Sequence, residues 1–287
     1  MVYGLLSNNL VVSINSKGAE LSSVKCGEIE YIWQADPVVW PRHTPVLFPI
    51  VGRLKNNTFN YNDQNYSLSQ HGFARDKEFT CISQSEKEIR FELVSDAETK
   101  KIFLFDFSLI ITYTLEDDTI VCTYEVTNPS TQNLFFSIGS HPGFKVPLGE
   151  NERFNEYKLK FDPTKEYKTT VLKDGLLSET KEKLRLTNGE LNLNTSLFDK
   201  DAMVFEDSQI DAISLISPKG KGVELNCKSW PYFGIWSKKG CNEFICLEPW
   251  YGITDNVNAS GELKTKKGII ELAGGMKFEC SFSLRFF

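Results

Sequence analysis

Strict alternation of apolar and polar residues in the middle of the chain is the feature that most limits how it can fold. Apolar side chains occupy every second position over residues 105–115, and the charged turn at residues 116–118 leads into a second alternating run over residues 119–127. A period of two is typical of a strand that is buried on one face, and the short turn predicts a hairpin. Residues 277–286 repeat the alternation. The chain is therefore expected to consist of β-strands.

Shorter strand-like runs recur at residues 10–14, 79–83, 89–94, 157–161 and 213–216. The best helical candidate, residues 178–186, is short, charged and poorly amphipathic. Without helical crossovers no parallel sheet can form. Many short strands separated by turns predict an all-β fold, a sandwich of two large antiparallel sheets. Because no linker or internal repeat divides the chain, residues 1–287 are expected to form a single domain.

The composition favours a small neutral ligand. Of the 287 residues 41% are hydrophobic, enough for a substantial core, and the formal net charge is -6. This charge gives no general attraction for nucleic acid or for an anionic membrane. The N-terminus lacks a basic segment, and no apolar run approaches the ~20 residues that span a bilayer. We expect a cytoplasmic protein, a monomer or a homodimer, that binds a small molecule and neither nucleic acid nor a membrane.

The cysteines form no recognisable metal or redox motif. The seven of them are scattered and include no C-x-x-C pair. Several fall on apolar faces of the expected strands, where a cysteine behaves as a small hydrophobic residue. The chain holds only three histidines, far apart in the sequence. A zinc site is therefore not expected, and we predict neither a metal ion nor a cofactor.

Five segments depart from the strand pattern and carry the candidate functional residues. Residues 40–54 hold three prolines and a Gly-Arg pair, which excludes a central strand and predicts an ordered loop. The other four segments place a polar residue beside a turn or at the expected end of a strand: His71 and Arg75, His141, Asp201, and Glu248. Each residue alone has a plainer explanation, because a turn histidine can bond to backbone and an arginine or a glutamate can be solvated.

Taken together and in order, these motifs resemble one family. They are GRL with Arg53, HGFAR with His71 and Arg75, SHPGF with His141, and LEPWYGITD with Glu248. The set resembles the aldose 1-epimerase, or galactose mutarotase, family, and within it the shorter bacterial branch associated with sugar-utilisation genes. The resemblance covers nearly the whole chain. It implies a galactose mutarotase-like supersandwich, a large antiparallel β-sandwich with a sugar-binding cleft on one concave face.

The resemblance implies that the protein interconverts the α and β anomers of an aldohexose. Ring opening needs one group to take the proton of the C1 hydroxyl and another to give a proton to the ring oxygen, and closure reverses both transfers. By resemblance, Glu248 is the general base, His141 the general acid, and His71 a second histidine that orients the opening sugar. We expect Glu248 to be ionised and His141 to be protonated, each favouring the charge of the other.

The resemblance also implies residues that bind the sugar. Arg53 corresponds to an arginine that hydrogen-bonds sugar hydroxyls, and Asp201 to a carboxylate that binds hydroxyls on the far side of the ring. Three other carboxylates compete for the second role: Asp199, Asp207 and Asp211. Three aromatic residues are candidates for packing against apolar sugar faces, with core packing an equal explanation: Phe73, Trp236 and Trp250.

Arg75 leaves the substrate class open, because some relatives act on hexose 6-phosphates and recognise the phosphate through arginines. Basic residues gather near it in the sequence, but Asp76 and Glu78 interleave with them. An arginine paired with a carboxylate explains the cluster equally well. We therefore rank a free aldohexose ahead of a hexose 6-phosphate.

Rival functional classes share some of these features. A non-catalytic carbohydrate-binding or sugar-sensing protein is compatible with the same fold, although the presence of both His141 and Glu248 favours an enzyme. A glycoside hydrolase needs two carboxylates that flank the bond, whereas the motifs supply one glutamate and two histidines. A serine hydrolase needs a G-x-S-x-G turn, which Ser140 lacks.

Overall fold

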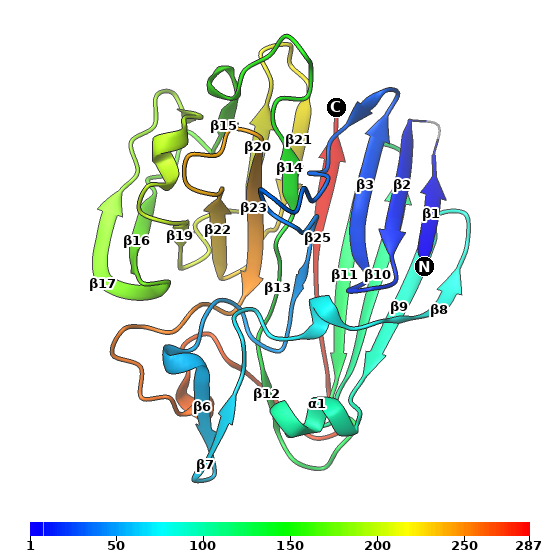
Figure 1. The fold of residues 1–287 in the computed structure, drawn as a ribbon, viewed down its shortest axis with the longest axis vertical. Coiled ribbons are helices and arrows are strands. Elements are labelled where there is room, and N and C mark those ends of the chain that lie inside the picture. Colours follow the sequence, from blue (N-terminus) through cyan, green and yellow to red (C-terminus); the bar gives the residue numbers. More distant parts are fainter. Residues whose placement is uncertain (8) are drawn as a thin grey trace.

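Antiparallel β-sheets make up most of the computed structural model, which describes residues 1–7 and 9–287 (Figure 1). The expected hairpin is formed by β10 (Ser108–Glu116) and β11 (Thr119–Thr127), which pair along their whole lengths. The expected strand near the C-terminus is β25 (Lys277–Phe286), and it pairs with β11. The prediction of an all-β fold from the alternation is therefore confirmed.

A nine-stranded sheet contains this hairpin. Its strands in spatial order are β18 (Glu190–Asn192), β15 (Lys158–Lys160), β20 (Ala212–Ile216), β21 (Gly222–Asn226), β25, β11, β10, β9 (Glu88–Val94) and β8 (Thr80–Gln84). The strand that is latest in the sequence thus lies in the middle of the sheet, between strands from the two halves of the chain.

An eight-stranded sheet carries most of the candidate residues. Its strands in spatial order are β17 (Leu176–Lys183), β16 (Lys168–Lys173), β19 (Met203–Phe205), β22 (Tyr232–Trp236), β23 (Phe244–Tyr251), β13 (Ile138–Ser140) and β5 (Val46–Leu47), with β14 (Gly143–Lys145) also paired to β23. A four-stranded sheet is formed, in order, by β1 (Val2–Leu6), β2 (Leu10–Asn15), β3 (Glu20–Cys26) and β4 (Ile29–Glu30). Two further pairs of strands are β6 (Thr58–Tyr61) with β7 (Gln64–Ser67), and β12 (Leu134–Phe136) with β24 (Ile270–Leu272).

Helices are few and short. The α-helix α1 (Ala97–Ile102) begins at a capping box, in which the Asp96 carboxylate accepts from the backbone N–H of Thr99. The described residues also form five 3₁₀ turns: η1 (Lys55–Asn57), η2 (Ala74–Asp76), η3 (Phe154–Glu156), η4 (Thr195–Phe198) and η5 (Leu263–Thr265). None of the helices formed by the described residues has the length and apolar character that a bilayer crossing requires.

The best helical candidate of the sequence, residues 178–186, falls largely on β17 (Leu176–Lys183), in agreement with its poor amphipathic character. The strand pairs with β16 and forms an edge of the eight-stranded sheet. Most of its side chains are exposed, and charges there cost little while they discourage pairing with another chain. An edge strand that is solvated on both faces shows no alternation, which removed the signal.

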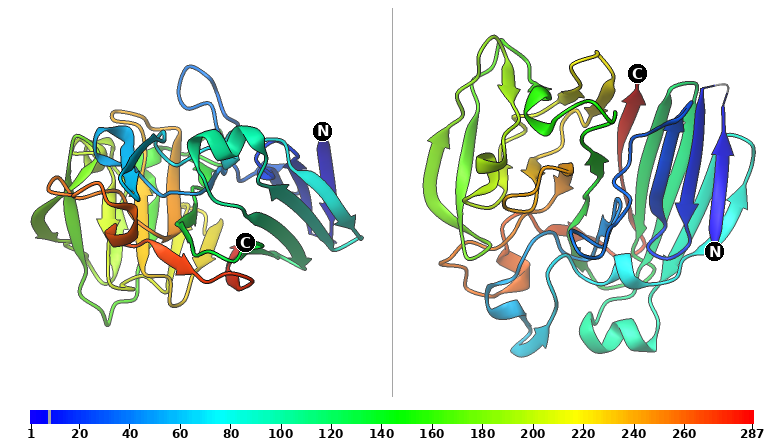
Figure 2. Two further views of the ribbon diagram at one scale, coloured as in Figure 1. Left: turned by 90° about the horizontal axis from the view of Figure 1, so that it is seen from below. Right: turned by 45° about the horizontal axis from the view of Figure 1, so that its top comes forward.

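One hydrophobic cluster joins the sheets. It takes inward side chains from the four-stranded, nine-stranded and eight-stranded sheets, for example Val12, Ile111 and Ile245. The four-stranded sheet, dark blue in Figure 1, lies over the β8–β11 part of the nine-stranded sheet, and Tyr3 packs edge-on against Phe91 there. Figure 2 shows this sheet toward one end of the molecule and the yellow-green strands β16 and β17 toward the other.

Alternation along β23 turns the candidate residues away from this core. Ile245 and Leu247 belong to the core cluster, so Glu248 and Trp250 point to the opposite face of the sheet. From the sequence, Glu248 is expected at the end of a strand. The strand in fact continues through the Pro-Trp pair to Tyr251, because paired neighbours on both sides, β22 and β13, keep the backbone extended.

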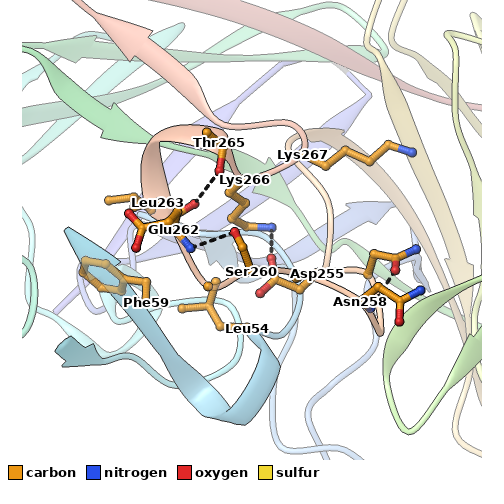
Figure 3. Close-up of a pocket in the computed structure, with 13 residues that line it drawn as sticks. Leu54, Phe59, Asp255, Asn258, Ser260, Glu262, Leu263, Thr265, Lys266 and Lys267 are labelled. Atoms are coloured by element: carbon orange, nitrogen blue, oxygen red, sulfur yellow. Dashed lines mark hydrogen bonds and ion pairs between the residues drawn. The ribbon is translucent and has the colours of Figure 1, made fainter. Parts of the chain in front are cut away.

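A buried ion pair forms in the segment that follows β23. The Lys266 side chain is only 3% exposed, and its ammonium lies 2.9 Å from Asp255 Oδ1 and donates to the carbonyl oxygen of Ile253 at 2.6 Å (Figure 3). Asp255 Oδ2 accepts from the backbone N–H of Lys55, and the Asp255 backbone bonds to Arg53 and Leu177. The pair therefore ties three separate chain segments together.

Candidate active site

A cavity of about 370 Å³ opens on the face of the eight-stranded sheet that is turned away from the core. This volume lies within the range of small-molecule sites. Most of the candidate residues line it: His71, Arg75, His141, Asp201, Trp236, Glu248 and Trp250. Candidate residues from four of the five segments singled out in the sequence thus meet in one cleft. The fifth segment, residues 40–54, contributes Trp40, Arg42 and Gly52 to the lining but not its candidate Arg53.

Glu248 lies in the middle of β23, opposite Gly234 of β22. It is 1% exposed. Burial raises the pKa of the Glu248 carboxyl well above its usual range, Trp250 opposes this rise, and the negative charge of Asp201 adds to it. The carboxyl oxygen Oε2 has no hydrogen-bond partner among the described residues. It therefore retains a free lone pair for a ligand.

His141 follows β13 and is held against Glu248. Its backbone N–H donates to the carbonyl oxygen of Pro45, and its Nε2 lies 3.2 Å from Glu248 Oε2. The two atoms are close but are not aligned for a hydrogen bond. The Trp40 indole stacks on the imidazole, with centroids 5.0 Å apart and planes 30° apart. Burial, with smaller effects from Arg75 and Arg42, lowers the pKa of His141 to about 3.

Burial thus favours a different charge state from the one expected for this pair. The raised pKa of Glu248 and the lowered pKa of His141 both favour a carboxylic acid beside a neutral imidazole. The cause is desolvation, since a charged form of either group loses its hydration without gaining equivalent contacts. The pair still holds one proton, which is the number that a carboxylate and an imidazolium hold together.

His71 is fixed in orientation and in tautomer. Its backbone adopts the left-handed conformation, with φ of 66°. Its Nδ1 accepts from the backbone N–H of Gly52, so the neutral ring carries its proton on Nε2. This atom lies 3.2 Å from the side-chain nitrogen of Gln70, and the Gln70 oxygen accepts the proton when the amide is turned by 180°. Burial and the nearby His141 lower the pKa of His71 well below its usual value. The ring is therefore a neutral hydrogen-bond donor at the cleft.

Two glycines allow Trp250 to lie across the sheet. A Cβ atom at Gly234 would come 2.4 Å from the Trp250 ring, and one at Gly139 would come 2.8 Å from it. These glycines lie on the strands that flank β23. The indole therefore covers both neighbouring strands beside Glu248 and forms an apolar wall of the cleft.

Arg42 and Arg75 bring two positive charges to the cavity. The Arg42 guanidinium lies 3.0 Å from Asp76 Oδ1, and Arg75 Nη2 donates to the carbonyl oxygen of Gln70 at 2.8 Å. Burial and the neighbouring Arg42 lower the pKa of Arg75 to about 10. The two guanidinium groups bring positive charge to one side of the cavity, so that side attracts anionic groups.

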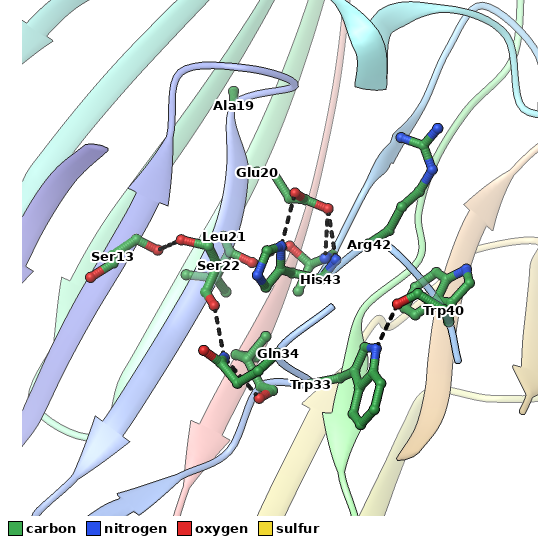
Figure 4. Close-up of polar contacts among 12 residues, drawn as sticks. Ser13, Ala19, Glu20, Leu21, Ser22, Trp33, Gln34, Trp40, Arg42 and His43 are labelled. Carbon is green, nitrogen blue, oxygen red and sulfur yellow. Dashed lines mark hydrogen bonds and ion pairs between the residues drawn. The ribbon is translucent and has the colours of Figure 1, made fainter. Parts of the chain in front are cut away.

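The four-stranded sheet anchors the loop that carries Trp40 and Arg42 (Figure 4). The Glu20 carboxylate accepts from the backbone N–H groups of His43 and Thr44 and lies 3.1 Å from the His43 ring nitrogen Nδ1. The Trp33 indole N–H donates to the carbonyl oxygen of Trp40 at 2.8 Å. Figure 4 shows the Arg42 side chain extending away from these anchors.

Of the four competing aspartates, Asp201 is the one that lines the cleft. Its backbone has a φ of 78°, and its Oδ1 accepts from the N–H of Ala202. Each of the other three is near a lysine instead: Asp199 near Lys239, Asp207 near Lys181, and Asp211 near Lys165.

Two expected sugar-binding residues lie outside the cavity lining. Phe73 is 7% exposed and packs in the core against Phe48 and Phe107, so it does not form an apolar face for a sugar. The Arg53 guanidinium donates to Asn57 and to the carbonyl oxygen of Asp174. Neither displacement could be read from the motifs, because the direction of a side chain in a turn depends on contacts with distant segments.

Four polar or aromatic lining residues were not among the sequence candidates: Trp40, Arg42, Gln70 and Thr254. All four were within reach of the motif analysis. Trp40 and Arg42 begin the proline-rich loop, Gln70 precedes His71, and Thr254 lies within LEPWYGITD. An aromatic and a basic residue together in an ordered loop were the available signal.

Comparisons with known proteins agree with this geometry. Residues 2–271 match the family model described as aldose 1-epimerase. The chain is 32% identical over 283 residues to the chromosomal Protein LacX of Lactococcus lactis subsp. lactis, with 95% of each chain covered. The plasmid-borne Protein LacX of the same organism matches equally well.

Solved structures share the whole fold. A galactose mutarotase related enzyme from Lactobacillus acidophilus superimposes with a TM-score of 0.95 at 34% identity, covering 100% of this chain and 97% of that one. A galactose mutarotase-like protein from Lactobacillus casei gives 0.93 at 28% identity, with both chains fully covered. The galactose 1-epimerase of Lactobacillus acidophilus gives 0.74 at 15% identity over 100% of this chain and 94% of that one, a likeness of fold alone.

Proposed function

Because the chain belongs to the aldose 1-epimerase family, we propose that it interconverts the α and β anomers of an aldohexose. The observation that carries this proposal is the pair formed by Glu248 and His141. Their Oε2 and Nε2 atoms lie 3.2 Å apart at the cleft, and burial leaves one proton between them. A pair with one proton can both accept and donate, as ring opening requires.

The proposed reaction begins when the proton of the pair passes from Glu248 to His141, over the 3.2 Å between them. Glu248 then takes the proton of the C1 hydroxyl through its free Oε2 lone pair while His141 gives a proton to the ring oxygen. The C1–O bond of the ring breaks and leaves an aldehyde. After rotation about the C1–C2 bond, both transfers run backwards. No cofactor is needed, because both proton carriers belong to the chain.

The other lining residues are proposed to hold the sugar. His71 donates from Nε2 to a sugar oxygen, since its Nδ1 is already occupied by Gly52. Asp201 accepts from hydroxyls on the far side of the ring, and Trp236 and Trp250 cover its apolar faces. The protein is proposed to act in the cytoplasm as a monomer or a homodimer.

The direct test is exchange spectroscopy between the α and β anomeric protons of glucose and galactose. We expect the protein to accelerate exchange in proportion to its concentration. If the folded protein leaves exchange at the rate of buffer while either sugar still raises its melting temperature, the non-catalytic sugar-binding function replaces this proposal.

A hexose 6-phosphate is the second candidate substrate, favoured by the two guanidiniums at the cleft. Arg75 Nε is buried without a hydrogen-bond partner among the described residues. Arg42 and Arg75 also share the half-exposed Asp76 as their ion-pair partner. The pair of arginines therefore retains positive charge that a phosphate can bind.

For this second function we expect Arg42→Gln to slow exchange of glucose 6-phosphate roughly tenfold to 100-fold, the loss of one charge-assisted hydrogen bond. Exchange of free glucose should change much less. Arg90→Gln, on β9 in the nine-stranded sheet, is the matched control and should leave both rates unchanged. Equal losses on both sugars would instead assign Arg42 to the binding of the ring and favour the free aldohexose.

A further inference from the structure

A thiol lies behind the proposed proton carriers. Cys246 precedes Glu248 by two residues on β23 and therefore points to the same face of the sheet. Its Sγ, one ring nitrogen of His141 and one carboxyl oxygen of Glu248 all lie within 4.8 Å of one another. Cys246 is fully buried. Nitrogen, sulfur and oxygen donors from three side chains thus converge on one point.

We propose that His141, Cys246 and Glu248 form a zinc site at the base of the cleft, and that an occupied site blocks the epimerisation. Thiolate, imidazole and carboxylate are the three protein ligands that Zn²⁺ prefers, and three protein ligands leave a fourth position for water or a sugar hydroxyl. The blocking part of this inference rests on the proposed function. The binding part does not.

The distances are near those of a zinc site. Zinc binds these donors at about 2.0 to 2.3 Å, which places the ligand atoms of a tetrahedral site about 3.5 Å apart. Nε2 of His141 and Oε2 of Glu248 are already 3.2 Å apart, so closure on a metal needs a shift of about 1 Å in the thiol. The Oε2 atom and the second His141 nitrogen, Nδ1, have no hydrogen-bond partner among the described residues. Binding through Oε2 therefore breaks no hydrogen bond of that atom.

Zinc binding exchanges protons for the metal. Zn²⁺ binds a thiolate, a carboxylate and a neutral imidazole, so the thiol proton of Cys246 and the proton of the Glu248–His141 pair leave when it binds. The two charges of the metal then balance the two anionic ligands. Two protons should leave for each zinc bound, and binding should tighten as the pH rises.

Other charged and titratable groups act on this trio from neighbouring elements. They are His71, Arg42, Arg75, Asp201 and Cys241. The two arginines oppose a cation and Asp201 favours one, and these opposing effects set the affinity without changing the number of protons released. The site could not be predicted from the sequence, because its ligands come from β23 and from the distant turn after β13.

The first test is a titration of the protein with Zn²⁺ in competition with a chromophoric chelator. We expect one zinc per chain, with about two protons released when calorimetry is repeated in buffers of different ionisation enthalpy. Cys246→Ser should weaken zinc binding by more than about 100-fold. This exceeds the usual loss when a residue that only hydrogen-bonds to a metal ligand is removed. Cys227→Ser, a buried cysteine elsewhere in the fold, is the matched control and should bind zinc as the wild type does.

Two further measurements guard against a folding defect. Co²⁺ bound to the wild type should show the charge-transfer absorption of a thiolate ligand, and exchange of the anomers should stop with one equivalent of Zn²⁺ and resume with EDTA. Equal zinc affinity in Cys246→Ser, or Co²⁺ binding without thiolate absorption, would overturn the site. Zinc bound at this site with undiminished exchange would overturn only the block. A protein that binds zinc but never exchanges anomers would reject the proposed function and leave the site standing.

Discussion

Glu248→Gln is expected to slow exchange of the anomers by about 10²- to 10⁴-fold, the usual contribution of a positioned proton carrier. The amide matches the carboxyl in size, so it fits the same buried position on β23, but it cannot take the proton of the C1 hydroxyl. It also removes the proton that Glu248 and His141 share. Exchange spectroscopy of the α and β anomeric protons measures the loss.

The control for this experiment is Glu243→Gln, an exposed carboxylate five residues earlier in the chain, which should keep the wild-type rate. Sugar binding to Glu248→Gln, followed by the fluorescence of the three cleft tryptophans Trp40, Trp236 and Trp250, should persist. If the variant binds the sugar and exchanges it at the wild-type rate, Glu248 is not the base. His71 and His141 would then have to supply both proton transfers.

Lys266→Met should lower the free energy of unfolding by about 3–5 kcal/mol, because it leaves the buried Asp255 carboxylate without its partner. The Lys266 side chain is 3% exposed and that of Asp255 5%. Burial lowers the pKa of Lys266 while Asp255 raises it. Methionine has a similar length and keeps the packing of the stem, so the lost charge dominates the result. Equilibrium unfolding in urea measures the change.

Lys264→Met is the matched control. This exposed lysine belongs to η5, the 3₁₀ turn that directly precedes Lys266, and bonds to the exposed Asn62. Its loss should cost less than about 1 kcal/mol. The double variant Lys266→Met with Asp255→Leu should recover part of the stability, since it removes the stranded charge. If Lys266→Met lowers the free energy of unfolding no more than Lys264→Met does, water must solvate the Asp255 carboxylate in place of the lysine.

The long strands β10, β11 and β25 of the nine-stranded sheet could be predicted because each has one face on the core. The alternation in β10, β11 and β25 records that burial directly. Alternation is missing from β17, which is mostly solvated at the edge of its sheet. It is also missing from β23, where both faces of the strand are buried from Phe244 to Trp250. A strand with no wet face leaves no period in the sequence.

Motifs located the main polar residues of the candidate site but not their surroundings. His71, His141 and Glu248 stand out because a charged or titratable residue beside a turn needs a reason. The stacking of Trp40 on His141, and the thiol of Cys246 beside them, arise from pairing between segments about one hundred residues apart. The inward position of Phe73 is equally a product of packing, since a Gly-Phe turn gives no direction to the ring.

The central position of β25 also bears on the order in which this protein acquires its shape during synthesis. The strand pairs with β11 on one side and with β21 on the other, so the two halves of the nine-stranded sheet can join only after this strand has been synthesised. Contacts between residues so distant in sequence form slowly. Until then the edge of β11 that pairs with β25 lacks its partner. Such a nascent chain depends on chaperones for longer than one that completes its sheet early.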